Sequence, residues 1–114
     1  MDGTKPSVIG LDDSVLRDAV ERIVAEFRPV RIVLFGSRAW GRPHAESDYD
    51  LLVLVHGEGD TMRASGRMSL ALRDLPAAFD VLVRPAARWR AWSDTPLTLE
   101  NRIEREGKNL YAAD

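Results

Sequence analysis

Two short apolar segments, separated by a Gly-Ser pair and an Asp-x-Asp element, constrain the fold of this chain more than any other feature. The segments VRIVLF (30–35) and YDLLVLV (49–55) are rich in β-branched and large apolar residues, which predicts two buried strands. Gly36 and Ser37 directly follow the first strand, and two aspartates stand where the second strand begins. These carboxylates require a chemical explanation, because a charge beside a buried strand is costly unless it is paired.

The two aspartates, Asp48 and Asp50, are expected on one face of their strand, because side chains alternate between the faces. Two carboxylates roughly 6.5 Å apart repel by about 2–3 kcal/mol at an effective dielectric constant of about 20. A divalent cation between them would remove that repulsion, and hard oxygen ligands favour Mg²⁺. A third aspartate, Asp80, lies in the apolar run 79–83 and would join the pair if the two strands were neighbours. Three carboxylates around two metal ions are typical of in-line displacement at phosphorus.

The Gly-Ser pair indicates a phosphate site. Gly36 allows the backbone to approach a ligand closely, and residues 38–40 are predicted to start a short helix. The free N–H groups of that helix, together with the Ser37 hydroxyl, suit an anion. A P-loop is disfavoured although the glycine spacing fits, because Arg42 occupies the position of the P-loop lysine and Pro43 that of the Mg²⁺-binding hydroxyl.

The rest of the chain alternates between predicted helices and strands. Its length of 114 residues is typical of one domain, expected over 12–114 after a loose leader at 1–11. Helices are predicted over 12–27, 61–75 and 97–107, and further strands over 79–83 and 109–112, whereas 84–96 fits a loop or a short helix.

Composition argues against several classes of function. With 16 basic and 18 acidic residues the net charge is −2, which disfavours direct binding to nucleic acid or to an anionic membrane. The chain has no cysteine, which excludes disulfides, thiolate metal sites and cysteine nucleophiles and fits a cytoplasmic protein. Its apolar runs are too short to span a bilayer, and its first residues do not have the pattern of a signal peptide.

The combination GSRAWG…SDYDLLV, with ten residues between Ser37 and Asp48 and a later lone aspartate in a strand, resembles the DNA polymerase β-like nucleotidyltransferase superfamily. The small size and the late stretch IEREGKNLY resemble the minimal nucleotidyltransferases of that superfamily. The resemblance implies an α/β (α+β) fold in which a small mixed β-sheet, flanked by helices, carries the site.

The same resemblance implies roles for two groups of residues. The first group would contact the nucleotide and consists of Gly36, Ser37 and Arg38. The second group would be catalytic and would bind Mg²⁺; it consists of Asp48, Asp50 and Asp80. The first group would hold the terminal phosphates of ATP. The second would bind two Mg²⁺ ions, and Asp80 would also help to deprotonate the attacking hydroxyl. The products would be a nucleotidylated acceptor and pyrophosphate. Trp40 stands where an arginine is common in related sequences, so one phosphate contact is expected to be absent.

The acceptor is expected on another chain, because larger members of the superfamily hold it in an additional domain for which this chain has no room. Minimal nucleotidyltransferases often pair with a HEPN-domain toxin. The resemblance therefore implies an antitoxin that transfers AMP from ATP to a tyrosine hydroxyl of that toxin. Two alternatives stay open: a non-catalytic antitoxin that neutralises its partner by binding alone, and a homo-oligomer that modifies a small molecule.

Each candidate residue also has a purely structural interpretation. Ser37 can cap the helix that follows it, and Asp80 can be a carboxylate without a function. Arg38 can be a plain surface charge. Trp89 and Trp92, three residues apart, are expected to anchor a helix in the core rather than to form a partner surface.

Overall fold

A four-stranded mixed sheet forms the centre of the protein in a computed structural model, which describes residues 13–41, 48–57 and 59–113. In spatial order the strands are β3 (Phe79–Pro85), β2 (Tyr49–Val55), β1 (Arg31–Phe35) and β4 (Lys108–Ala112). β1 is antiparallel to β2 and to β4, whereas β2 and β3 are parallel. The expected leader at 1–11 lies outside the described residues.

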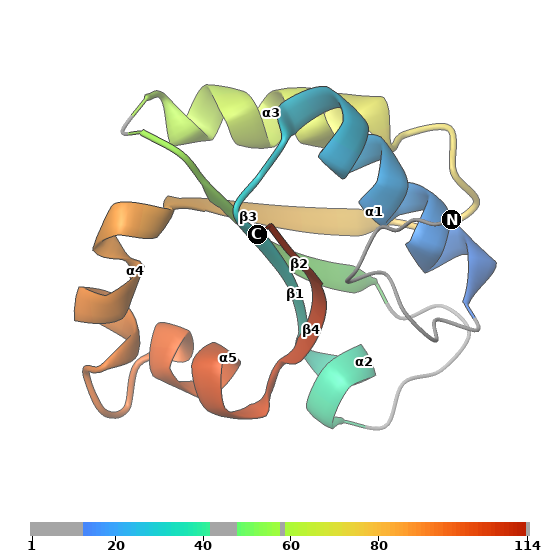
Figure 1. The fold of residues 1–114 in the computed structure, drawn as a ribbon. Coiled ribbons are helices and arrows are strands. Elements are labelled where there is room, and N and C mark those ends of the chain that lie inside the picture. Colours follow the sequence, from blue (N-terminus) through green and yellow to red (C-terminus); the bar gives the residue numbers. More distant parts are fainter. Residues whose placement is uncertain (1–12, 42–47, 58, 114) are drawn as a thin grey trace.

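Helices cover both faces of this sheet (Figure 1). One face is covered by α1 (Ser14–Phe27) and α3 (Thr61–Ala71), and the other by α4 (Ala86–Ser93) and α5 (Leu99–Glu106). The short helix α2 (Ser37–Trp40) directly follows β1. The prediction of a small mixed sheet flanked by helices is thereby confirmed. No helix in the described part of the chain is long and apolar enough to cross a bilayer.

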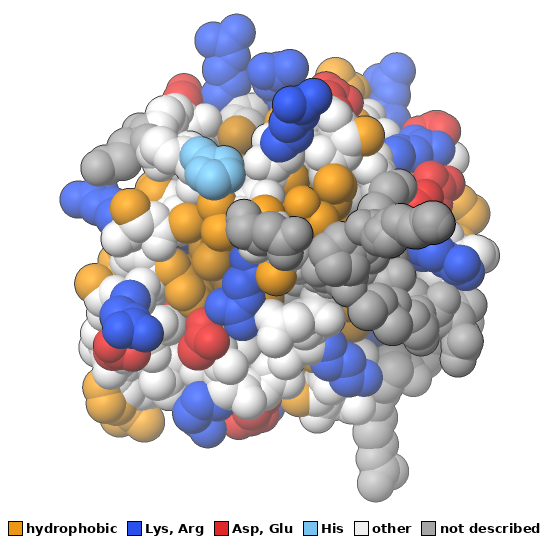
Figure 2. Space-filling view, viewed as in Figure 1, with side chains coloured by type: hydrophobic (Ala, Val, Ile, Leu, Met, Phe, Trp, Pro, Cys, Tyr) orange, Lys and Arg blue, Asp and Glu red, His pale blue; other side chains and the backbone are white. Residues whose placement is uncertain are grey.

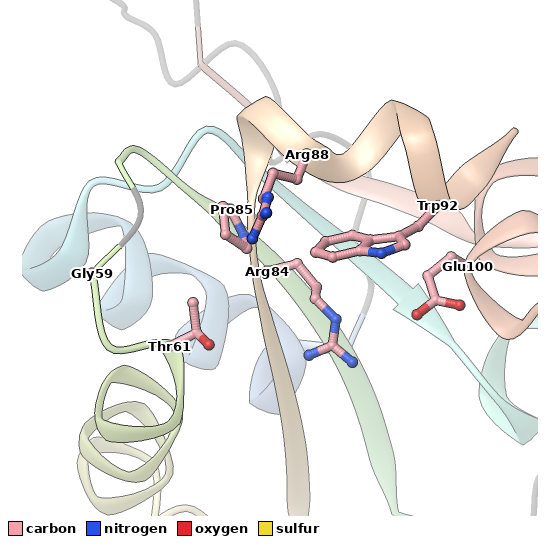
Figure 3. A pocket seen from close by; sticks show the side chains of 7 residues that line it. All are labelled: Gly59, Thr61, Arg84, Pro85, Arg88, Trp92 and Glu100. Carbon is pink, nitrogen blue, oxygen red and sulfur yellow. The ribbon is translucent and has the colours of Figure 1, made fainter.

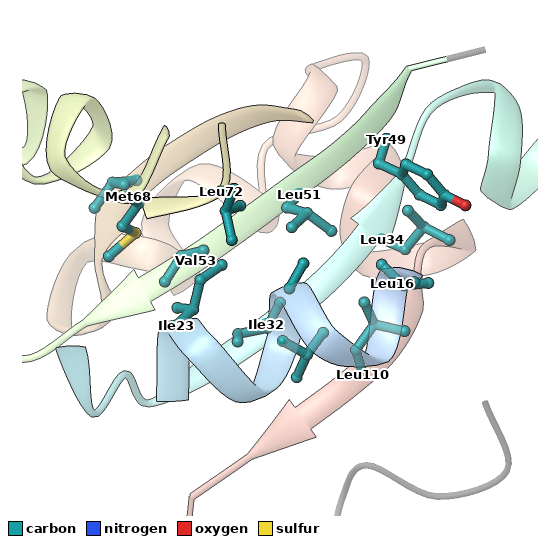
Figure 4. Close-up of a cluster of buried hydrophobic side chains, with 13 residues drawn as sticks. Leu16, Ile23, Ile32, Leu34, Tyr49, Leu51, Val53, Met68, Leu72 and Leu110 are labelled. Atoms are coloured by element: carbon teal, nitrogen blue, oxygen red, sulfur yellow. The ribbon is translucent and has the colours of Figure 1, made fainter. Parts of the chain in front are cut away.

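The alternation of side chains along the strands produces a hydrophobic core on each face. Ile32 of β1 and Leu51 of β2 belong to the cluster that packs against α1 and α3 (Figure 4). Their sequence neighbours Val33 and Leu52 belong to the cluster on the side of α4 and α5. Asp50 has the same parity as Leu52, so its carboxylate is directed to the face of α4 and α5.

The first helix ends where the sequence predicts and begins two residues after the predicted start. Its N-cap is Asp13, whose carboxylate accepts the Leu16 N–H at 3.0 Å. Asp12, the other predicted cap, lies outside the described residues. Arg28 adopts a left-handed conformation with a φ of 46°, and its N–H donates to the Val24 carbonyl.

The predicted end of the helix after β2 was wrong. A helix over 61–75 was expected, but α3 ends at Ala71. Beyond it the backbone tightens into turns in which the N–H groups of Arg73 and Leu75 donate to carbonyls three residues earlier. Leu72 is buried and Leu75 packs against the same core, so the apolar spacing continues through the turn and could not mark the end of the helix.

The second half of the chain follows the prediction with shifted ends. α4 forms in the segment that fitted a loop or a short helix, and β3 continues two residues beyond the predicted strand, to Pro85. α5 begins at Leu99 rather than at Leu97. The reason is that Leu97 has a left-handed φ of 68° and that Thr98 caps the helix by accepting the Asn101 N–H at 3.0 Å.

Two glycines lead to opposite predictions for stability. At Gly107, which ends α5, an added Cβ would lie 2.6 Å from the Ile103 carbonyl oxygen and 2.6 Å from Val33 Cγ1. At Gly66, inside α3, an added Cβ would meet no atom of the described residues within 4 Å. We expect Gly107→Ala to lower the free energy of unfolding by about 1–3 kcal/mol through overpacking. Gly66→Ala should raise it by about 0.5–1 kcal/mol through helix propensity. Urea unfolding measures both, and two changes of the same sign would contradict this packing.

Glu104 joins α5 to β1 and to α4. Its Oε1 accepts hydrogen bonds from Arg31 Nη1 at 2.9 Å and from Trp89 Nε1 at 2.7 Å. The hydrogen bond from Arg31 lowers the pKa of Glu104 below its ordinary value of 4.5; partial burial opposes this effect, and the bond from Trp89 adds to it. The carboxylate therefore favours the folded state only while it is ionised.

Replacement of Glu104 by glutamine is expected to destabilise the protein in a pH-dependent way. Because the pKa is lower in the folded state, the stabilisation is present above pH 4.5 and is lost as the pH falls through the folded-state pKa. At pH 7 we expect a loss of about 1 kcal/mol, a modest value because the Glu104 side chain is 40% exposed. Urea unfolding over a pH series should show the variant approaching wild type in acid, whereas a gap that widens would contradict this assignment.

Candidate active site

The turn between β1 and α2 lies against the carboxylate of Asp50. Gly36 occupies the N-cap position of α2 with a φ of 77°, a conformation that favours glycine. A Cβ added to Gly36 would overlap Asp50 Oδ2. Strand pairing explains this contact, because the register partner of Asp50 in β1 is Phe35, the residue before the glycine. The fold thus brings Gly36, the first residue of the Gly-Ser pair, into direct contact with the second aspartate of the Asp-x-Asp element.

The parallel pairing of β2 and β3 brings Asp80 beside Asp50. The two residues are register partners, and each is the second residue of its strand. Their shared parity directs both side chains to the face of α4 and α5. The condition set by the sequence, that strand 79–83 lie beside strand 49–55, is met. Asp48 immediately precedes β2 and is exposed, as is Asp80, whereas Asp50 is half-buried.

Negative charge accumulates at Asp50. Burial raises the pKa of Asp50 above its usual range, and the charges of Asp80 and then of Asp48 raise it further. The charges of both other predicted carboxylates therefore act on Asp50. A cation bound at this position would offset the energetic cost of burying the Asp50 charge and the repulsion between Asp50 and the other two carboxylates.

The carboxylates offer the donor atoms that a hard cation prefers. Oxygen ligands fit Mg²⁺, which is usually held by one or two carboxylates together with substrate phosphates. Within the ranges that the structure describes, no three acidic, histidine or cysteine side chains are grouped closely enough to hold one ion. The predicted ligands are therefore neighbours without forming a complete coordination shell of their own, and metal binding stays a prediction.

Ser37 and Arg38 begin α2 next to this carboxylate. The N-cap of α2 is Gly36, without a side-chain hydrogen bond, so capping of this helix does not account for the exposed Ser37 hydroxyl. Arg38 lies over the ring of Tyr49, with its Cζ 4.0 Å from the ring centroid. It is therefore more than a plain surface charge. The contacts of both residues with a nucleotide stay predictions.

Trp40 joins α2 to α5. The residue packs against the core on the side of α4 and α5, and its ring centroid lies 6.2 Å from that of Phe35. The Arg102 guanidinium of α5 lies over the Trp40 ring, with its Cζ 4.1 Å from the centroid. The tryptophan that stands in place of an expected arginine thus brings an arginine from another element to the end of α2.

Sequence reasoning missed the pairing of Asp13 with Tyr49. The Tyr49 hydroxyl donates to the Asp13 carboxylate. Burial raises the pKa of Tyr49 to about 12, an effect to which the hydrogen bond to Asp13 contributes. Burial acts to raise the pKa of Asp13 as well, but hydrogen bonds from Tyr49 and the α1 backbone lower it overall. A buried tyrosine in a strand does signal that its hydroxyl needs a partner, but nothing in the sequence identified which residue provides it.

A separate pocket of about 410 Å³ lies at the other end of β3 (Figure 3). Its lining includes Arg84 of β3, Arg88 and Trp92 of α4, and Glu100 of α5. Arg84 is four residues beyond Asp80, which places the pocket roughly 13 Å along the strand from the carboxylates. The Arg84 Cζ lies 5.8 Å from the Trp92 ring centroid. Arginine and glutamate side chains thus line this pocket together, at a distance from the candidate site.

The surface carries charges of both signs. On the face viewed in Figure 2, Lys and Arg side chains are interspersed with Asp and Glu side chains. Among the described residues, charged side chains of opposite sign form ion pairs, such as Arg22 with Asp74 at 2.6 Å and Arg102 with Glu106 at 3.2 Å. This mixture agrees with the balanced composition and gives the face no broad basic field for nucleic acid.

Comparisons with known proteins agree with this fold. The family model described as "Polymerase beta, Nucleotidyltransferase" matches residues 19–114. A crystal structure of a toxin-antitoxin with AMP-PNP is similar in fold, with a TM-score of 0.52 and 20% identity over 85% of this chain and 73% of that chain. A structure from Sulfolobus solfataricus, described as a candidate nucleotidyltransferase, has a TM-score of 0.56 and 19% identity over 91% of this chain and 92% of that chain. No curated protein gives a significant match.

Proposed function

The chain belongs to the polymerase beta nucleotidyltransferase family, and we propose that it is a Mg²⁺-dependent enzyme that transfers AMP from ATP to a hydroxyl group. The observation that carries this proposal is the contact between Gly36 and the Asp50 carboxylate, with Asp80 as the register partner of Asp50. That contact unites a backbone turn suited to phosphates with carboxylates suited to a metal ion. If Asp48, Asp50 and Asp80 had only a structural role, the repulsion at Asp50 would destabilise the protein with no functional gain.

In this proposal each motif has one task. The turn at Gly36 and the hydroxyl of Ser37 bind the terminal phosphates of ATP. Asp48 and Asp50 hold Mg²⁺, which when bound neutralises phosphate charge and helps to orient the triphosphate. Asp80 contributes to the second metal position and accepts the proton of the attacking hydroxyl.

The reaction is an in-line displacement at the α-phosphorus. The acceptor oxygen forms a bond to that phosphorus while the bond to the oxygen bridging toward the β-phosphate breaks. Pyrophosphate leaves, and the proton of the acceptor hydroxyl passes to the Asp80 carboxylate. The acceptor ends as an AMP ester. Orientation of the two reactants accounts for a large share of the rate enhancement in such a site.

We place the acceptor hydroxyl on a partner toxin, as a tyrosine of a HEPN-domain protein, with this chain acting as its antitoxin in the cytoplasm. The resemblance of the two motifs to minimal nucleotidyltransferases supports this choice. The likeness in fold to a toxin-antitoxin crystallised with AMP-PNP supports it further. AMP-PNP is an ATP analogue, which is why ATP is the proposed donor.

The proposal is tested with ATP labelled at the α-phosphate, incubated with Mg²⁺, lysate of the native host and the purified protein. An Asp48→Asn/Asp50→Asn variant serves as the parallel sample. A labelled protein that appears only with wild type supports the proposal, and mass spectrometry then identifies the acceptor and the modified residue. Label on RNA would overturn the protein acceptor. No label with any of the four nucleoside triphosphates would overturn the transfer itself.

A non-catalytic antitoxin would behave differently in cells. The Asp48→Asn/Asp50→Asn variant changes two side chains and leaves the rest of the surface unchanged, so binding alone would still neutralise the toxin. Under our proposal the variant fails to protect cells that express the partner. Protection equal to that of wild type would favour the binding module.

A further inference from the structure

Tyr49 is the point where four structural elements meet. It lies between Asp48 and Asp50 in sequence, but its side chain is directed to the opposite face of the sheet, where it is 5% exposed. Figure 4 shows it beside Leu34 at one end of the core cluster. Whatever holds the Tyr49 ring therefore also fixes the backbone that carries both aspartates.

Three contacts hold the tyrosine. The ring stacks on Phe79 of β3, with centroids 4.9 Å apart and an interplanar angle of 14°. Arg38 of α2 lies over the ring, with its Cζ 4.0 Å from the centroid. The hydroxyl donates to the carboxylate of Asp13, the N-cap of α1. The Tyr49 side chain is thus hydrogen-bonded through its hydroxyl to the N-cap of α1, and its ring contacts side chains of β3 and α2.

The partners of Tyr49 are sequence neighbours of the predicted site residues. Arg38 directly follows Ser37, and Phe79 directly precedes Asp80. Tyr49 and Phe79 are register partners, one step before the register partners Asp50 and Asp80. The stacked rings on one face of the sheet therefore set the positions of the carboxylates on the other.

We infer that Asp13, Arg38, Tyr49 and Phe79 form a positioning cluster, which holds the Asp-x-Asp segment in place against the Gly36–Ser37 turn. The inference rests on the proposed function, because it names residues that act through the proposed metal and phosphate ligands. Asp13, Tyr49 and Phe79 act on those ligands through the backbone and do not touch the substrate, so they are positioning residues. Arg38 holds the Tyr49 ring and also stays a predicted nucleotide contact. Asp13 is the anchor, since it ties the tyrosine to the first turn of α1.

The chain offers a matched control for Asp13. Asp60 is the N-cap of α3 and accepts the Arg63 N–H at 3.0 Å, just as Asp13 accepts the Leu16 N–H at 3.0 Å. Asp13→Ala and Asp60→Ala therefore remove equivalent caps. Asp13→Asn keeps an oxygen that can accept the Leu16 N–H and places an amide NH2, which can donate to the Tyr49 hydroxyl, where Oδ2 now accepts from it, so this substitution serves as the conservative variant. Tyr49→Phe removes only the hydroxyl and keeps both ring contacts.

The first readout is the Mg²⁺ concentration that gives half-maximal binding of an ATP analogue with a methylene bridge between the α- and β-phosphates. We expect Asp13→Ala to raise this concentration by about tenfold, in the range seen when the supports of metal ligands are removed. Tyr49→Phe should raise it by about two- to tenfold, as expected for one lost hydrogen bond. Asp13→Asn and Asp60→Ala should stay within about twofold of wild type.

The second readout is amide hydrogen exchange at Tyr49, whose N–H donates to the Ala78 carbonyl at 2.9 Å. Exchange there should be about tenfold faster in Asp13→Ala and unchanged in Asp60→Ala. If wild type itself does not bind the analogue in a Mg²⁺-dependent manner, the proposed function fails, and this exchange measurement still decides the positioning role. Equal behaviour of Asp13→Ala and Asp60→Ala in exchange and in the Mg²⁺ response would overturn the inference.

Discussion

Replacement of Asp50 by asparagine is expected to lower the rate of nucleotidyl transfer by about 100- to 1,000-fold or more while leaving the protein at least as stable as wild type. The catalytic loss follows because Asp50 is the only half-buried carboxylate of the three and lies against the turn proposed to bind phosphate. The stability is maintained because the variant removes a charge that burial and two neighbouring carboxylates disfavour. We expect a free energy of unfolding equal to that of wild type or up to about 1 kcal/mol higher.

This combination separates a functional carboxylate from a structural one. Transfer is measured as incorporation of label from α-labelled ATP into the acceptor, and stability by urea unfolding without nucleotide. Asp94→Asn, at an exposed acidic residue that ends α4, is the control and should change neither quantity. A variant at Asp50 that keeps its activity, or that unfolds more readily by 2 kcal/mol or so, would contradict the role given to this residue.

Introduction of a methyl group at Gly36 should impair both folding and transfer. The φ of 77° disfavours any residue with a Cβ, and the added Cβ would overlap Asp50 Oδ2. For the backbone strain alone a cost of about 1 kcal/mol is typical, and the overlap adds to it by moving the carboxylate. Gly36→Ala should therefore destabilise the protein by about 2–4 kcal/mol and lower transfer by about 100-fold.

Gly57 supplies the control for this variant. It has nearly the same conformation, with a φ of 74°, but a Cβ added there meets nothing within 4 Å in the part of the chain that the structure describes. Gly57→Ala thus introduces the strain without the overlap, and it should lower stability by about 1 kcal/mol and leave transfer unchanged. If the two variants behave alike in unfolding and in activity, the contact between Gly36 and Asp50 does not contribute to stability or to transfer.

The strands and the acidic pair were predictable because their signals are local. The run from Tyr49 to Val55 matches β2 at both ends, since a continuous apolar run followed by a turn-rich loop leaves little freedom. The position of Asp80 beside Asp50 depended on a strand order that the sequence only posed as a condition. The local spacing of residues predicts which strands contain candidate site residues. Which strands pair with one another is determined by packing over the whole sheet.

Other features depend on tertiary contacts that no local pattern encodes. The end of α3 was predicted beyond Ala71, because Leu72 and Leu75 keep a helical spacing inside a turn. The start of α5 depends on the left-handed backbone of Leu97, and a leucine gives no sequence signal for this conformation. Asp13 was predicted only as a helix cap, and its bond to Tyr49 became visible once α1 was placed against β2.

Equilibrium binding of the methylene-bridged ATP analogue, which the proposed site could bind but not cleave, is the most direct test of nucleotide and metal binding at Gly36 and Asp50. Wild type and Asp50→Asn are titrated with the analogue in Mg²⁺ and again in EDTA. We predict that Mg²⁺ tightens binding to wild type by about tenfold or more and tightens binding to Asp50→Asn by less than about threefold. Equal affinities of wild type in Mg²⁺ and in EDTA, or an undiminished Mg²⁺ effect in Asp50→Asn, would contradict a nucleotide and metal site at Gly36 and Asp50.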